Sequence, residues 1–198
     1  MASDCLPIAF PPEMVRAIRA GRKTMTRRVG RYGPPGTLLW VREAWRTVEG
    51  EDRTKPRDLT PAHRFWYEAD AADAPHQPGY GKLRPAMFMP RFASRMTLEV
   101  VSSRLERLHD ISAKDILAEG AVERAHDDQF GHNPVSAFDG KVYLDLRSLW
   151  ASGWEQINGP GSWAENPLLW VVEFKVLSPL EHARLKSCEE SLCKPMNA

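Results

Sequence analysis

Segments with the pattern of β-strands are few and unevenly spaced along this chain, and their spacing constrains the fold more than any other feature of the sequence. Strand patterns are expected at residues 6–10, 22–28, 37–45, 95–108 and 167–177. This spacing does not suit a doubly wound sheet, and no glycine-rich nucleotide-binding fingerprint follows a strand. The element order predicts an α+β fold: a small, mostly antiparallel β-barrel with helices packed over the barrel mouth.

Three segments carry the signals of helices. The first helix is expected at residues 12–20 and ends at Gly21, because glycine suits the left-handed position that terminates a helix. The second begins at Ser112, which together with Asp115 predicts a capping box, and it ends at Gly120. The third is indicated by residues at helical spacing on one face: Leu149, Trp150, Gly153, Trp154 and Ile157.

Two long stretches, at about 46–90 and 121–142, lose the periodicity of regular structure. The first is rich in Asp, Pro, Gly and Ala, and we expect an excursion from the core with one or two short strands. The second is expected to be irregular, and residues 178–198 form a polar tail with a helix signal. Loops as long as the first stretch commonly carry function.

The sequence predicts a cytoplasmic protein without a membrane helix. Its apolar runs are far shorter than the roughly 20 residues that such a helix needs. The first ten residues lack the pattern of a secretory signal. The three cysteines, Cys5, Cys188 and Cys193, suggest neither a disulfide framework nor a zinc site. We therefore expect no metal and no cofactor.

A basic segment without any acidic residue lies between Glu13 and Glu43. Such a segment suits phosphate or another anion, although a solvated positive face would have the same composition. The formal net charge of the whole chain is only +1, which argues against binding a long duplex and fits a nucleoside, a nucleotide or a short single strand. The basic residues of the segment are Arg16, Arg19, Arg22, Lys23, Arg27, Arg28, Arg31 and Arg42.

Lys23 and Glu119 are the two candidate chemical groups that the local sequence indicates. Lys23 follows the end of the first helix, where Arg22, Arg27 and Arg28 would lower its pKa by repulsion and favour its use as a base. Glu119 is placed at the carboxyl end of the second helix, where the helix dipole disfavours a negative charge. The alternatives are an exposed surface lysine and a frayed helix end.

The chain contains seven tryptophans, and most of them fall on expected strand or helix faces. Core packing is the first explanation for Trp40, Trp150 and Trp170. Trp45, at a strand end, and Trp163, in a glycine-containing loop, are candidates for stacking on a base.

The segment after the first expected helix resembles the signature of ASCH domains, which are small barrels related to the PUA fold of RNA-modification proteins. Residues 21–28 read GRKTMTRR and are similar to the family pattern Gly-x-Lys-x-x-Thr-x-Arg. The turn and strand at 35–41, the helix at 112–120 and the closing strand at 170–174 follow in the family's order. The resemblance implies a PUA-like fold.

The chain most resembles the longer ASCH proteins of phage and prophage genomes, which share the stretches at 89–91 and 93–95. This resemblance covers about residues 5–177. It implies one domain that carries the insertions at 46–90 and 121–142, with the tail at 178–198 outside the domain.

One branch of the family is a bacterial N4-acetylcytidine amidohydrolase, and the resemblance carries its proposed catalytic set onto Lys23, Thr26 and Glu119. It implies that Lys23 takes a proton from Thr26, whose hydroxyl attacks the amide carbonyl, while Glu119 orients or protonates the leaving amine. The chain is nearly twice the length expected of that compact enzyme, and its two insertions could reshape the pocket.

Two functions from different classes follow, and RNA cleavage in a pocket without histidine is a third alternative. In the first, a basic cleft binds a nucleobase-containing ligand, such as RNA, a nucleotide or a modified nucleoside, without chemistry. In the second, the protein is an amidohydrolase that removes an acyl group from N4-acylated cytidine or a similar nucleoside. The expected ligand-binding residues, besides Lys23, Thr26 and Glu119, are Arg22, Arg27, Arg28, Trp45, Arg91 and Trp163.

Overall fold

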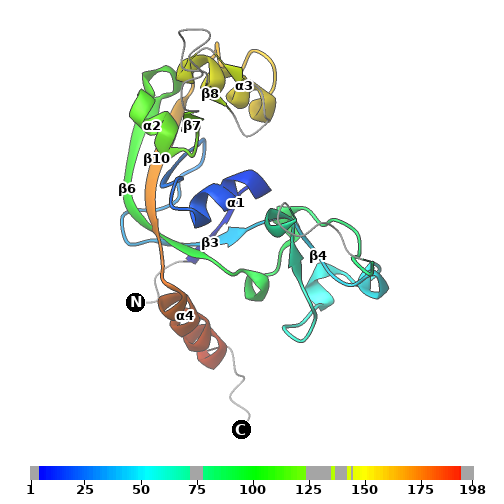
Figure 1. Ribbon diagram of the computed structural model, residues 1–198. Helices are drawn as coiled ribbons and strands as arrows, with labels where there is room; N and C mark the ends of the chain where they lie inside the picture. The colour runs from blue at the N-terminus through cyan, green and yellow to red at the C-terminus, as the bar shows by residue number, and fades with distance from the viewer. Residues whose placement is uncertain (1–4, 72–77, 124–134, 137–141, 144, 193–198) are drawn as a thin grey trace. The chain divides into compact units, whose positions relative to one another are not determined.

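The computed structural model describes residues 5–71, 78–123, 135–136, 142–143 and 145–192 (Figure 1). The chain divides into two compact units. The first unit combines Met1–Val15, Gly36–Glu99 and Lys175–Ala198, and the second combines Arg16–Pro35 with Val100–Phe174. The single family domain expected over residues 5–177, with a tail at 178–198, stays a prediction.

Five strands form one mixed, mostly antiparallel sheet in the order β1-β3-β6-β10-β2. β1 pairs in parallel with β3, whereas β3 with β6 and β10 with β2 are antiparallel. Each strand lies close to a segment that the sequence periodicity predicts. Their bounds are Cys5–Ala9 (β1), Met25–Arg28 (β2), Leu38–Arg42 (β3), Thr97–Arg107 (β6) and Leu168–Val176 (β10).

The sheet is open, so the expectation of a closed barrel is wrong. A barrel requires its two edge strands to pair with each other. Among the described strands, the edges are β1 and β2, and each is hydrogen-bonded to one neighbour in this sheet. Hydrophobic alternation identifies a strand and its buried face, but it does not specify which strand lies beside it. The predicted α+β class is consistent with this sheet and its few helices.

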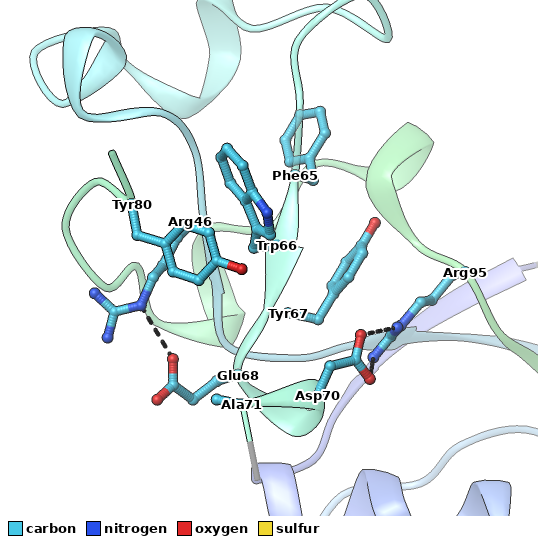
Figure 2. A pocket seen from close by; sticks show the side chains of 9 residues that line it. All are labelled: Arg46, Phe65, Trp66, Tyr67, Glu68, Asp70, Ala71, Tyr80 and Arg95. Carbon is cyan, nitrogen blue, oxygen red and sulfur yellow. Dashed lines mark hydrogen bonds and ion pairs between the residues drawn. The ribbon is translucent and has the colours of Figure 1, made fainter. Parts of the chain in front are cut away.

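In the first unit, the excursion at 46–90 contains a short two-stranded antiparallel sheet. Strand β4 (Trp45–Arg46) pairs antiparallel with β5 (Trp66–Tyr67). The described part of the stretch also contains 3-10 turns at Glu49–Glu51, Pro56–Asp58, Glu68–Asp70 and Ala86–Phe88. The sheet confirms the expectation of short strands in the excursion. Trp45 packs in a buried cluster with Leu59, Met89 and Ala93. A pocket lies beside β5 (Figure 2).

In the second unit, helices α2 (Ala113–Ala118) and α3 (Leu146–Asn158) confirm two of the helix predictions. α3 buries Leu149 and Trp154, as its spacing predicts, and Gly159 ends it with a φ of 101°. Ile157 was expected on the same face but is exposed, which is a correction to that prediction.

The irregular stretch expected at 121–142 contains a small antiparallel sheet instead. Its strands are β7 (Val122–Glu123), β8 (Val135–Ser136) and β9 (Val142–Tyr143). Each strand has only two residues, too few for hydrophobic alternation to be recognised in the sequence. Residues 124–134 and 137–141 of the expected stretch lie outside the described residues.

The remaining helices are α1 (Pro12–Arg19) and α4 (Pro179–Leu192). α1 buries Val15 and Ile18, and α4 confirms the helix signal in the tail. None of the helices in the described part of the chain combines the length and the apolar content needed to cross a lipid bilayer.

Candidate functional site

Backbone hydrogen bonds hold the segment that joins α1 to β2. Gly21 follows α1 with a φ of 71°, in the left-handed region. The Thr24 N–H donates to the Ala118 carbonyl at 2.8 Å, and the Phe174 N–H donates to the Thr24 carbonyl at 2.9 Å. Thr24 is therefore bonded both to the end of α2 and to β10, and these bonds fix the position of Lys23 beside it.

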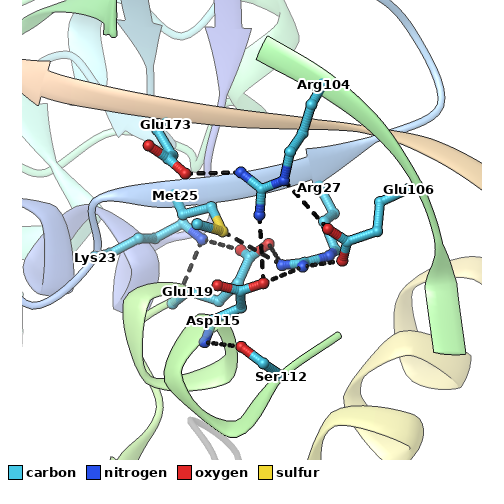
Figure 3. A network of polar contacts seen from close by, with 9 residues as sticks. All are labelled: Lys23, Met25, Arg27, Arg104, Glu106, Ser112, Asp115, Glu119 and Glu173. Atoms are coloured by element: carbon cyan, nitrogen blue, oxygen red, sulfur yellow. Dashed lines mark hydrogen bonds and ion pairs between the residues drawn. The ribbon is translucent and has the colours of Figure 1, made fainter. Parts of the chain in front are cut away.

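Lys23 and Glu119, which are 96 residues apart in the chain, meet at the end of α2 (Figure 3). The Lys23 Nζ lies 2.5 Å from Glu119 Oε2 and also donates to the Glu119 carbonyl oxygen at 3.0 Å. The two side chains are 0% and 3% exposed. Because water is excluded, this charge-assisted hydrogen bond is stronger than its equivalent on a surface.

The pKa of the Lys23 ammonium is lowered, in the direction that the sequence predicts. Burial of the amine is the largest cause, and the positive charges of Arg28 and Arg27 add to it, while Glu119 acts in the opposite direction. From the sequence, only the neighbouring cations could be identified as a cause of the lowered pKa, because the burial of Lys23 depends on α2 and β10. A neutral amine is thus easier to reach here than on a solvated lysine.

Arg27 makes ion pairs with three carboxylates, and its Nη1 also donates to the Met25 sulfur at 3.4 Å. Its Nη2 lies 2.6 Å from Glu106 Oε1 and 2.7 Å from Asp115 Oδ2, and its Nη1 lies 3.6 Å from Glu119 Oε1. The Arg27 side chain is 1% exposed. The sequence predicted that Arg27 holds phosphate in a basic cleft. In the structure its charge is balanced by acidic side chains instead.

Arg104 extends this arrangement across β6 and β10. It makes ion pairs with Glu173 at 2.7 Å, with Glu106 at 3.2 Å and with Asp115 at 3.5 Å. Four carboxylates therefore surround three cations, so the site is not electropositive as the sequence suggested. We call this set the charge cluster (Figure 3): Lys23, Arg27, Arg104, Glu106, Asp115, Glu119 and Glu173.

Two buried polar atoms of the charge cluster have no hydrogen-bond partner among the described residues. They are Glu119 Oε1, an acceptor, and Arg27 Nε, a donor. The 3.6 Å separation between Glu119 Oε1 and Arg27 Nη1 is an ion-pair contact that is too long for a hydrogen bond. Unsatisfied buried groups are rare in native proteins, so these two atoms single out the contact between Arg27 and Glu119.

Thr26 does not join the contact between Lys23 and Glu119. It is buried in β2 beside Val172 of β10. Alternation along β2 places Thr26 on the face opposite to Met25 and Arg27. In the described part of the chain, no hydrogen bond joins the Thr26 hydroxyl to Lys23 or Glu119.

The other predicted site residues of the second unit lie outside the charge cluster. Arg22 is exposed, and its Nη1 donates to the Gly120 carbonyl at 3.4 Å. Arg28 is half-buried at the end of β2, close enough to Lys23 to affect its pKa. Trp163 is half-buried, with its ring centroid 4.5 Å from that of His109.

In the first unit, Trp45 is a core residue. Its side chain is fully buried and its ring centroid lies 5.5 Å from that of Phe65, so it has no open face on which a base could stack. Arg91 begins a short turn, Arg91–Ala93, and is exposed.

Arg104 and Glu106 were not predicted from the sequence as site residues. Their spacing of two along β6 places both on one face of the strand, and that was the available signal. Asp115 was predicted only as half of a capping box. Its N–H donates to Ser112 Oγ at 3.1 Å, but its carboxylate binds Arg27 instead of returning to Ser112.

Replacing Ser112 with alanine is expected to lower the free energy of unfolding by about 1 kcal/mol, because α2 loses its N-terminal cap. Urea unfolding followed by circular dichroism measures this change. Ser112→Asp keeps a side-chain acceptor at the cap and serves as the control. Equal stability of the Ser112→Ala variant and the wild type would contradict the assignment of the cap.

No group of three or more His, Cys, Asp or Glu side chains in the described residues is arranged to hold a metal ion. Comparisons of the chain with family models, with curated proteins and with solved structures find no match.

Proposed function

We propose that this protein, whose segment after α1 resembles the ASCH signature, binds a nucleobase-containing ligand at Lys23 and Glu119. One observation carries the proposal: Lys23 Nζ contacts one Glu119 oxygen at 2.5 Å, while the other, Oε1, is buried without a hydrogen-bond partner among the described residues. A carboxylate can accept from the N4 amino group of cytosine, and an ammonium group donates to base acceptors. Together they match an edge that presents a donor beside an acceptor.

The charge balance of the site favours a small ligand over long RNA. The cluster pairs Arg27 and Arg104 with carboxylates, so they have little charge to offer to phosphates. Phosphate contacts would fall to Arg22 and Arg28 at its margin. Binding that depends on few phosphate contacts varies little with salt concentration, which suits a modified nucleoside or a nucleotide better than RNA.

A second candidate function is removal of an acyl group from an N4-acylated cytidine. The lowered pKa of Lys23 favours it, because a neutral amine can act as a base. No hydrogen bond joins Thr26 to Lys23 in the structure, so this reaction requires the Thr26 hydroxyl to approach the amine when the substrate binds. Lys23 would then take the proton of the hydroxyl, and Thr26 Oγ1 would bond to the acyl carbon. The C–N bond would then break, with the proton passing to the departing nitrogen under the influence of Glu119. Water would finally hydrolyse the acyl-threonine ester.

The test is calorimetric titration of the full-length protein with cytidine and with N4-acetylcytidine, together with chromatography of the second ligand for turnover. Lys23→Met removes the ammonium while keeping an unbranched side chain. Lys114→Met is the matched control, since Lys114 is exposed on the neighbouring α2. We expect saturable binding by the wild type and by the control, and at least tenfold weaker binding by the Lys23 variant.

The outcomes separate the two functions. Binding without turnover supports a binding domain, whereas turnover that is lost in both Lys23→Met and Thr26→Val supports the amidohydrolase. Turnover that persists in Thr26→Val excludes Thr26 as the nucleophile. If the folded wild type binds neither ligand, or if Lys23→Met binds both as the wild type does, the proposal is wrong.

A further inference from the structure

The excursion at 46–90 holds a pocket that the proposed function does not use. Its walls come mostly from β5 and the turn after it, and Tyr80 and Arg95 complete them (Figure 2). The volume of the pocket is about 240 Å³. Because a cavity of about 150 Å³ is large enough to bind benzene, this pocket has room for one aromatic ring with a small substituent.

Four aromatic side chains line this pocket: Phe65, Trp66, Tyr67 and Tyr80. The ring centroids of Trp66 and Tyr80 lie 4.7 Å apart, and the planes of these two rings are inclined by 43° (Figure 2). All four side chains are half-buried, so each keeps part of its surface open to solvent. Aromatic rings prefer offset-stacked or edge-to-face contacts with one another, and the open surface of these rings can make such contacts with a further ring.

The charged groups that line the pocket form two ion pairs. Arg46 Nε lies 3.1 Å from Glu68 Oε2, and Arg95 Nη1 lies 2.5 Å from Asp70 Oδ2. The charges of the lining residues therefore sum to zero, and each charge has a counter-ion within the protein. A charged ligand would lose its hydration without meeting an excess of opposite charge in the lining, so the pocket favours an uncharged ligand.

Guanidinium groups of the protein already lie over two of the aromatic rings. The Arg95 guanidinium lies 4.0 Å from the Tyr67 ring centroid, and that of Arg64 lies 5.0 Å from the Trp66 ring centroid. The negative faces of aromatic rings attract cations in this way. Because the protein supplies these cations itself, the rings do not require a cationic ligand.

We infer that the pocket of Phe65, Trp66, Tyr67 and Tyr80 binds an uncharged aromatic or heteroaromatic ring of a small molecule. A flat ring can pack against the open ring surfaces and remove apolar area from water. A saturated ring of the same size lacks the electron distribution that favours these stacked and edge-to-face contacts. The site belongs to the first unit and does not depend on the function proposed for Lys23.

Four probes of similar size test the ring and its charge. Benzamide is the uncharged aromatic probe, cyclohexanecarboxamide carries the same amide on a saturated ring, benzamidine is a cation, and benzoate is an anion. The full-length protein is titrated with each at constant ionic strength, and its backbone amide and indole N–H signals are followed by NMR. The indole signal of Trp66 is identified by its loss in Trp66→Phe. We expect saturable binding of benzamide, and binding about threefold to tenfold weaker for each of the other probes.

Two variants test the walls of the pocket, with benzamide as the ligand. Trp66→Leu and Tyr80→Leu each remove a ring and keep an apolar side chain, and each should weaken binding about threefold to tenfold. The two substitutions lie on different segments, so the test remains valid if one variant folds poorly. Phe88→Leu is the matched control, because Phe88 is an aromatic residue of the same unit that is 54% exposed and does not line the pocket. This control should bind benzamide as the wild type does.

Three results would overturn the inference. The first is the absence of saturable binding of benzamide to the folded protein. The second is equal binding of benzamide and cyclohexanecarboxamide, or equal weakening by Phe88→Leu and Trp66→Leu, which would indicate general hydrophobic adsorption. The third is tighter binding of benzamidine or benzoate than of benzamide, which would assign the pocket to a charged ligand.

Discussion

Replacing Glu119 with leucine is expected to lower the free energy of unfolding by about 3–5 kcal/mol, because it leaves the Lys23 ammonium buried without its carboxylate. The double variant Lys23→Met with Glu119→Leu should lower the free energy of unfolding much less than Glu119→Leu alone, since two apolar side chains can fill the same space. Urea unfolding of the two single variants and the double variant measures the coupling. Glu165→Leu, at an exposed position in the same unit, is the control.

The decrease in the free energy of unfolding caused by Glu119→Leu should become smaller as the pH rises. Glu119 is what raises the pKa of Lys23 against burial, so without it that pKa falls further. Between this lowered pKa and the ordinary value of 10.5, the unfolded chain holds a proton that the native state has released. Stability therefore rises with pH across this range. An unfolding free energy for the variant that stays constant from pH 7 to pH 10 would contradict this account.

Replacing Trp45 with alanine is expected to destabilise the protein by about 3–5 kcal/mol, because a fully buried indole is removed from the cluster with Leu59, Met89 and Ala93. Thermal and urea unfolding measure this loss. Trp45→Phe retains a ring against Phe65 and should lose less.

The same variant separates a core role for Trp45 from the base-stacking role that the sequence suggested. If Trp45 were a surface platform for a base, Trp45→Ala would weaken ligand binding and leave the free energy of unfolding unchanged. Met87→Ala, at a residue 64% exposed in the same unit, should change the unfolding free energy by no more than about 0.5 kcal/mol. Comparable stabilities of Trp45→Ala and Met87→Ala would show that the indole does not support the core.

Local patterns predicted the elements of the fold better than their arrangement. The alternation of apolar residues located β6, and glycine and capping signals located α1 and α2, because each signal lies within one segment. The open edges of the sheet depend on which strands pair over long distances in the chain, and no local signal reports that. The strands β7, β8 and β9 were not predicted for a different reason: two residues are too few for alternation to be recognised.

The charge cluster shows the same division between local and distant information. Local sequence identified both Lys23 and Glu119 as candidates. Lys23 lies among arginines, and Glu119 lies at the end of a predicted helix. The carboxylates of Glu106 and Asp115 reach Arg27 only because folding brings α2 and the far end of β6, which is separated from β2 by β10, close to this side chain. The positive segment of the sequence is therefore balanced by carboxylates. The charge distribution along the chain predicted a cleft that binds anions. In the folded protein, carboxylates of the protein itself pair with these cations.

The segments of the two units are interleaved along the chain, and this affects how the protein emerges from the ribosome. The second unit begins at residue 16 but needs the strand that ends near Phe174, and the first unit needs residues from 175 onward. Neither unit can therefore be completed until the chain has been synthesised to about residue 175. Early segments such as β1 and α1 form their final contacts only with partners that are translated much later, so folding depends on closing long loops.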